Sequence, residues 1–287
     1  MMDNERTPAM IRPPAVAGTF YPREPEALRA ALDDAFCSPL GPGSASPVAP
    51  AREVFGLICP HAGYIYSAQA AAWAFAQLAD TETPQAVVLL GVNHRGIGAP
   101  LALSGADGWA TPLGIAPIAR DMTARLRELD SALLIDERAH RQEHSLEVQL
   151  PFLQARFGDI SIIPIVLAAP EQQEVLRLGT ALSVLAREVR LLFVASTDFS
   201  HYIPQREAEA RDQRALAEIA RVDARGLLAV VQRQGITMCG VLPVATLLEA
   251  ARGAGITTAT VLHYHTSGDV TGDHQQVVGY GAAVLYR

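Results

Sequence analysis

The chain has 287 residues, of which 49% are apolar and 18% are charged, a composition typical of a globular protein and not of a disordered one. Its 23 Lys and Arg residues against 30 Asp and Glu residues give a net charge of −7 without any basic cluster, so we expect neither nucleic acid nor a membrane surface as a partner. Three widely spaced cysteines and an N-terminus without an apolar leader favour a cytoplasmic protein.

The pattern of apolar segments predicts an α/β fold over 1–287 as a single three-layer domain. A helix is predicted from about Pro25, and the Pro-, Ser- and Gly-rich residues 38–52 are typical of an exposed loop. Continuous apolar strands then alternate with helices, which favours a mostly parallel central sheet with helices on both faces. The predicted strands are 54–59, 86–92, 161–168, 191–197, 257–265 and 275–286, of which we expect the last two to form an antiparallel pair at one edge. The predicted helices are 67–79, 118–129, 143–157 with a kink at Pro151, 171–189, 205–220, 223–232 and 240–255.

Histidines follow three of the predicted strands. His61 follows the first strand, His94 the second, and Asp198 with His201 follows "LLFVAST". Ligands of open α/β sheets bind beyond the carboxyl ends of the strands, so these side chains are expected at one edge. Cys239 stands before a predicted helix, whose dipole would favour the thiolate. Two imidazoles and a thiolate would form a site for a transition metal, with Asp198 or His201 as its hydrogen-bond partner or as a general base.

Each of these residues also has an ordinary structural interpretation. A single histidine after a strand is usually a hydrogen-bonded residue at the edge of the sheet, and a single cysteine is usually a small core residue, which is what we expect of Cys37 and Cys59. Three histidines at equivalent strand ends strengthen the case for a joint site, which then explains them as well as the separate interpretations do. The spacing of the residues does not identify the metal.

The segment "EHSLEVQ" adds His144, which would lie in the first turn of a helix that begins near Glu143 and could point to the same edge. It is not the H-E-x-x-H motif of zinc proteases, because the order of the residues differs. A surface histidine with local hydrogen bonds explains His144 equally well. Tyr64 and Tyr66 beside His61 could bind a ligand or anchor the turn, and the polar residues 265–274 favour a solvated hairpin loop.

Several blocks of sequence together resemble the Memo family, whose bacterial and archaeal members are called AmmeMemoRadiSam system protein B. The resemblance extends from Arg12 to Tyr286. The blocks are "RPPAVAGTFYP", "CPHAGYIYS", "GVNH", "EHSLEVQLPFLQ", "STDFSHY", "MCG" and "YHTSGD" with "GYGAAV".

The resemblance implies the fold of the class III extradiol dioxygenases, a group of non-haem iron enzymes. It implies metal ligands at His61, His94 and Cys239, where the dioxygenases carry a carboxylate in place of the cysteine. It also implies His201 at the position of the catalytic base, with Asp198 and His144 in the same cleft. The set expected to bind substrate is Tyr64, Tyr66, Asn93 and Ser200.

Our first hypothesis is therefore a metal-dependent redox enzyme or oxygenase-like protein that uses Fe(II), or copper, on an unknown small molecule. The alternative is a binding module without catalysis, in which the same cleft holds an anionic ligand or a peptide. The family's name further implies an AMMECR-type protein and a radical-SAM enzyme as partners.

Overall fold

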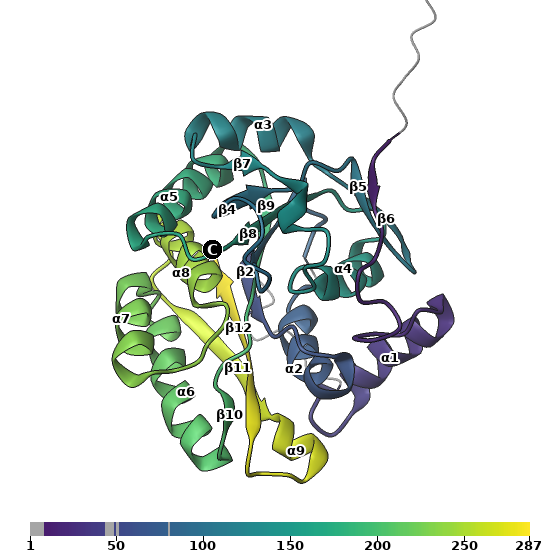
Figure 1. Ribbon diagram of the computed structural model, residues 1–287, viewed down its shortest axis with the longest axis vertical. Coiled ribbons are helices and arrows are strands. Elements are labelled where there is room, and N and C mark those ends of the chain that lie inside the picture. The colour runs from purple at the N-terminus through teal and green to yellow at the C-terminus, as the bar shows by residue number, and fades with distance from the viewer. Residues whose placement is uncertain (1–8, 44–48, 50–51, 80) are drawn as a thin grey trace, which may run out of the picture.

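A mixed β-sheet of nine strands runs through the centre of the computed structural model, which describes residues 9–43, 49, 52–79 and 81–287 (Figure 1). The strand order is β10-β12-β2-β9-β3-β8-β4-β7, and β11 pairs with residues 279–285 of β12. The central strands are parallel and buried on both faces, as their continuous apolar sequences require. These four are β2 (Val54–Cys59), β9 (Leu191–Ser196), β3 (Ala86–Val92) and β8 (Ile162–Leu167).

Antiparallel strands flank this parallel centre on both sides. On one side lie β12 (Val277–Tyr286), β11 (Ala259–Thr266) and the short β10 (His201–Ile203). On the other side lie β4 (Leu101–Leu103), antiparallel to β8, and β7 (Leu134–Ile135). The predicted antiparallel pair at one edge is thus confirmed. A separate small sheet of β1 (Ile11–Arg12), β5 (Gly108–Thr111) and β6 (Gly114–Pro117) was not predicted.

Helices cover both faces of the sheet, and alternate strand residues supply the two apolar cores. Leu57 and Leu89 face one core, whereas Ile58 and Leu90 face the other. The first face is covered by α1 (Pro25–Cys37), α2 (Tyr64–Ala76) and α4 (Leu150–Phe157). The second is covered by α3 (Arg120–Leu129), α5 (Gln172–Glu188), α6 (Gln205–Ala220), α7 (Ala224–Gln234) and α8 (Val241–Gly253). The predicted three-layer α/β fold is confirmed. In the part of the chain that the structure describes, no helix is long and apolar enough to span a bilayer.

Some local predictions are wrong. Pro151 does not kink a helix from residue 143, because α4 begins at Leu150 after a 3₁₀ turn, and a proline in the first turn removes no helical hydrogen bond. The polar loop at 265–274 contains the short helix α9 (Ser267–Thr271), whose start Asp269 caps. Cys37 is exposed and not in the core, whereas Cys59 is buried as expected. The predicted loop 38–52 lies partly outside the described residues.

A buried ion pair fastens the N-terminal segment to the segment before α4. Arg12 Nη1 lies 2.7 Å from Glu147 Oε2, and both side chains are buried. The guanidinium also donates to the backbone carbonyls of His140 (2.8 Å) and Glu143 (2.7 Å). The Glu147 carboxylate in turn accepts the Tyr21 hydroxyl and two backbone N–H groups of the N-terminal segment. Residues 140–147 are therefore fixed in place by a charge pair out of contact with water.

His140 makes the folding free energy depend on pH. Burial, together with the charge of Arg12, lowers the pKa of His140 from 6.5 to about 3, so the folded protein keeps this ring neutral. A histidine whose pKa is lower in the folded state binds a proton more readily in the unfolded state. The fold is therefore most stable above pH 6.5, and it loses stability as the pH falls toward 3. Between pH 7 and pH 5 this loss amounts to about 2 kcal/mol.

We therefore expect the unfolding free energy of the wild type to fall between pH 7 and pH 5 by about 2 kcal/mol more than that of His140→Gln. Urea unfolding at the two pH values measures the difference. Equal losses in the two proteins would show that His140 binds a proton in the folded state near its ordinary pKa.

Candidate metal centre

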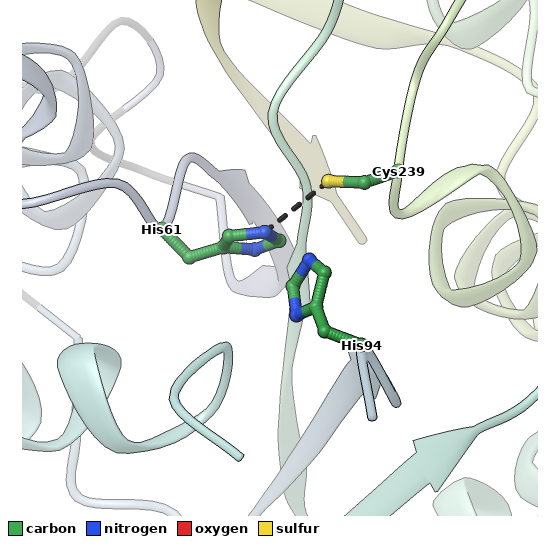
Figure 2. A group of neighbouring side chains, drawn as sticks. All are labelled: His61, His94 and Cys239. Atoms are coloured by element: carbon green, nitrogen blue, oxygen red, sulfur yellow. Dashed lines mark hydrogen bonds between the residues drawn. The ribbon is translucent and has the colours of Figure 1, made fainter. Parts of the chain in front are cut away.

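Four separate chain segments meet beyond the carboxyl ends of the parallel strands. His61 follows β2 and His94 follows β3, while β9, which lies between them in the sheet, leads to Asp198. The loop before α8 brings Cys239 to the same point, and Figure 2 shows the two imidazoles and the sulfur converging. The structure therefore brings together the three predicted metal ligands.

The donor atoms of these residues have the spacing that a metal ion needs. The potential ligand atoms of His61, His94 and Cys239 all lie within 4.8 Å of one another, and Cys239 Sγ is 3.2 Å from His61 Nε2. Bonds of about 2.0–2.3 Å to an ion place neighbouring donors roughly 3.3–3.8 Å apart. The group therefore fits a transition metal ion with small side-chain movements.

The hydrogen bonds of His61 fix its tautomer. Its Nδ1 lies 2.9 Å from Ser196 Oγ. That hydroxyl already donates its proton to the Ser145 carbonyl (2.6 Å) and accepts a bond from Gln149 Nε2 (3.0 Å). Because the hydroxyl has one proton, His61 Nδ1 must be the donor in their shared bond. The Nε2 of His61 therefore carries a lone pair, which faces the Cys239 sulfur at 3.2 Å.

His94 is oriented in the same way by Glu143, a role that the sequence analysis did not assign. His94 Nδ1–H donates to Glu143 Oε1 (2.9 Å), and its backbone N–H donates to Oε2 (2.7 Å). Burial alone would raise the pKa of Glu143, but the hydrogen bonds from the His94 ring and the Ser145 N–H lower it to about 2. A carboxylate behind a metal-binding histidine fixes the tautomer and raises the basicity of the ring.

We expect Glu143→Gln to weaken metal binding by about 10- to 100-fold, because the amide cannot stabilise His94 as the carboxylate does. Competition with a metal-sensitive chelating dye measures the affinity. Glu137→Gln is the control, since Glu137 is a half-buried carboxylate that accepts the backbone N–H groups of Gly105 and Ala106 and hydrogen-bonds to none of the three predicted ligands. Equal affinities in all three proteins would contradict the role of Glu143.

Asp198 connects the segments that carry two of the ligands. Its Oδ1 accepts the backbone N–H of His61 (2.8 Å). Its own N–H donates to Cys239 Sγ (3.3 Å), and the Cys239 N–H donates to its carbonyl (3.2 Å). Burial raises the pKa of Asp198 to about 6. These contacts make Asp198 a positioning residue for the predicted ligands.

The expected stabilisation of a Cys239 thiolate by a helix dipole is wrong. Helix α8 begins at Val241, so Cys239 lies outside its first turn. Burial, with the charge of Asp198, raises the pKa of the Cys239 thiol well above its usual range. A bound metal would displace this proton, because thiolate is the ligand. The following Gly240 is needed here, since a Cβ would lie 2.3 Å from the Ser196 carbonyl oxygen.

His201 presents a free ring nitrogen to the same cleft. Its Nδ1–H donates to the Thr237 carbonyl (2.9 Å), and its backbone N–H donates to Thr237 Oγ1 (2.7 Å). The Nε2 of His201 therefore carries a lone pair, as a general base requires. Thr237, and not Asp198, orients this ring, and nothing in the spacing of the sequence indicated that partner.

His144 lies in the cleft beside the predicted ligands, although it precedes a 3₁₀ turn instead of beginning a helix. Its ring stacks on His94 at 4.6 Å between centroids and contacts Phe20 at the same distance. Burial lowers its pKa to about 4, so the ring is neutral. His94, Glu143 and His144 form a second group able to hold an ion, but Glu143 there already accepts the ring and backbone N–H groups.

The cleft has a volume of about 720 Å³. Of the four residues predicted to bind substrate, Tyr66 lines the cleft. Tyr64, Asn93 and Ser200 are not among the described residues that line it. Tyr64 is buried and donates to a backbone carbonyl, Asn93 holds the turn after β3, and Ser200 donates to the buried Asp212. The cleft is lined by Phe20, His61, Ala62, Gly63, Tyr66, His94, His144, Asp198, His201, Tyr202, Ser267, Thr271, Asp273, Gln276, Val278 and Tyr280.

Comparison with known proteins gives a consistent assignment. The sequence model of the family described as "Memo-like protein" matches residues 12–284. A MEMO1 family protein of Methanopyrus kandleri is 39% identical over 97% of this chain and 100% of its own length, and one of Methanothermobacter thermautotrophicus is 40% identical over 94% and 99%. The crystal structure of an uncharacterized protein of Escherichia coli K12 has a similar fold, with a TM-score of 0.54 at 16% identity over 80% of this chain and 99% of that one.

Proposed function

The chain belongs to the Memo-like protein family, and from that premise we propose that it is a metal-dependent redox protein whose ion is held by His61, His94 and Cys239. The observation that carries the proposal is the meeting of two Nε2 lone pairs with one sulfur atom. The second nitrogen of each ring is already engaged as a donor, so both rings are prepared to act as ligands.

The donor set favours iron or copper. Imidazole suits both metals, and a thiolate in place of a carboxylate increases the preference for copper. Three protein ligands leave coordination positions open for a substrate. When bound, such an ion supplies one-electron chemistry and polarises an oxygen atom of its ligand.

The protein's own residues would hold the small molecule and move its proton. His201 Nε2, free to accept, would act as the general base, with Thr237 holding the ring in orientation. Asp198 would keep the His61 and Cys239 segments at a fixed separation. Phe20 and His144 cover one side of the cleft, which would limit the access of water to the reacting atoms.

A second candidate function is binding of an anionic ligand or peptide without catalysis. The cleft contains four imidazoles, which favours this second function. Arg95 also lies near enough to His144 for its charge to lower the pKa of that ring, in addition to the effect of burial. Against it, the described residues that line the cleft include no Arg or Lys to neutralise a phosphate. Calorimetric titration with a phosphotyrosine peptide separates the two functions: binding that survives a chelator supports the second candidate.

Reconstitution under anaerobic, reducing conditions tests the first proposal. We expect close to one iron or copper ion per chain by elemental analysis, and oxidation of the loaded protein by oxygen at a rate that the metal-free protein does not reach. A protein that stays metal-free with both metals would rule the proposal out.

A further inference from the structure

Tyr202 has an unusual conformation at the mouth of the cleft. Its φ of +56° lies in the left-handed region, which bulky side chains rarely adopt. The residue is 72% exposed, so no packing of its ring requires that conformation. Left-handed residues of this kind are concentrated at functional sites, where the surrounding structure holds them.

A β-bulge explains how this conformation is held and what it achieves. In the pairing of β10 with β12, His201 is opposite Val278 and Ile203 is opposite Val277, so one extra residue, Tyr202, lies on β10. In a regular strand, His201 and Tyr202 would point to opposite faces of the sheet. Here both line the cleft, with their rings 5.9 Å apart, because the bulge redirects the second side chain.

Other aromatic rings line the cleft with Tyr202. Tyr66 and Tyr280 line the same cleft as Tyr202. Phe20 lines the cleft from the N-terminal segment, where its ring contacts His144. An exposed aromatic side chain that lines the cleft of a proposed metal site offers a flat face for contact with a flat part of the bound molecule.

From this geometry we propose that Tyr202 determines the specificity of the cleft, by stacking on a flat, unsaturated part of a small molecule whose other end reaches the metal. The inference rests on the metal site described above. It assigns Tyr202 to recognition and leaves proton transfer to His201.

Two simple metal ligands test the proposal without knowledge of the natural substrate. Imidazole and 4-phenylimidazole bind a metal through the same ring nitrogen and differ by one flat phenyl group. In the metal-reconstituted wild type we expect 4-phenylimidazole to bind about five-fold more tightly than imidazole, the factor that one aromatic pair supplies. Tyr202→Phe keeps this ratio and Tyr202→Asn lowers it to about one, while the affinity for imidazole stays unchanged in both.

Stability provides a second readout that distinguishes recognition from structural support. Asn adopts the left-handed region more readily than Tyr, so we expect Tyr202→Asn to melt at or above the wild-type temperature. Ile135→Asn, at the exposed far edge of the sheet, controls for loss of apolar surface and should keep the five-fold ratio.

An unchanged ratio in Tyr202→Asn, or a wild type that binds its metal but shows no preference for 4-phenylimidazole, would overturn the role of Tyr202 alone. A wild type that binds no metal would overturn the metal site and this inference together, and elemental analysis of the same sample tells the two cases apart.

Discussion

Cys239→Ala is expected to weaken metal binding by about 100- to 1,000-fold, because it removes one of three protein ligands and the only sulfur among them. Structural sites with four ligands gain roughly 10–16 kcal/mol from the metal, so each ligand contributes about 2.5–4 kcal/mol. The sulfur makes only weak hydrogen bonds, at 3.2–3.6 Å to His61 and Asp198, so the variant should remain folded. Chelator competition on the reconstituted proteins measures the change.

Cys37→Ala is the matched control for this prediction. Cys37 is exposed at the end of α1, so its removal should leave the affinity unchanged. If Cys239→Ala keeps the wild-type affinity, or if Cys37→Ala loses it as well, the sulfur at the site is not a ligand. Circular dichroism of both variants excludes loss of the fold as the explanation.

Arg12→Met is expected to lower the unfolding free energy by about 3–5 kcal/mol. The substitution leaves Glu147 as a buried charge without its cation and also removes donors from the His140 and Glu143 carbonyls. Because this buried ion pair fixes the segment that carries Glu143 and His144, we also expect weaker metal binding at temperatures where the protein is still folded. Urea denaturation gives the free energy.

A double-mutant cycle separates the ion pair from its surroundings. Arg12→Met with Glu147→Gln should be more stable than the sum of the two single losses predicts, because no unpaired charge remains buried. Arg138→Met is the control, since Arg138 pairs with Asp136 at the surface, where such a pair contributes at most about 1 kcal/mol. Equal losses of unfolding free energy for Arg12→Met and Arg138→Met would contradict the proposed role of the Arg12–Glu147 ion pair.

The sequence predicts the fold well because its strands are continuous apolar runs that need helices on both faces. β2, β3 and β9 follow that rule, and the position of His61 and His94 at their ends follows from the parallel arrangement. The separate β1–β5–β6 sheet escaped prediction because its strands are two to four residues long, too short for an alternating pattern.

The partners of the site residues could not be predicted in the same way. Glu143 binds His94 across 49 positions in the chain, and Thr237 binds His201 across 36, so both contacts depend on tertiary structure. Ser200 was expected to bind substrate, but adjacent side chains at a strand end can point apart, and its hydroxyl donates to Asp212 instead. Burial raises the pKa of the Cys239 thiol more than the nearby hydrogen bonds, including that of Gly240 at the start of α8, lower it.

X-ray absorption at the metal edge of the reconstituted protein tests the central claim most directly. The claim is that one ion binds the sulfur of Cys239 together with the Nε2 atoms of His61 and His94. We predict one sulfur at about 2.3 Å and two imidazole nitrogens at about 2.0–2.1 Å, with the sulfur contribution absent in Cys239→Ala. A metal surrounded by nitrogen and oxygen alone in the wild type would contradict the claim.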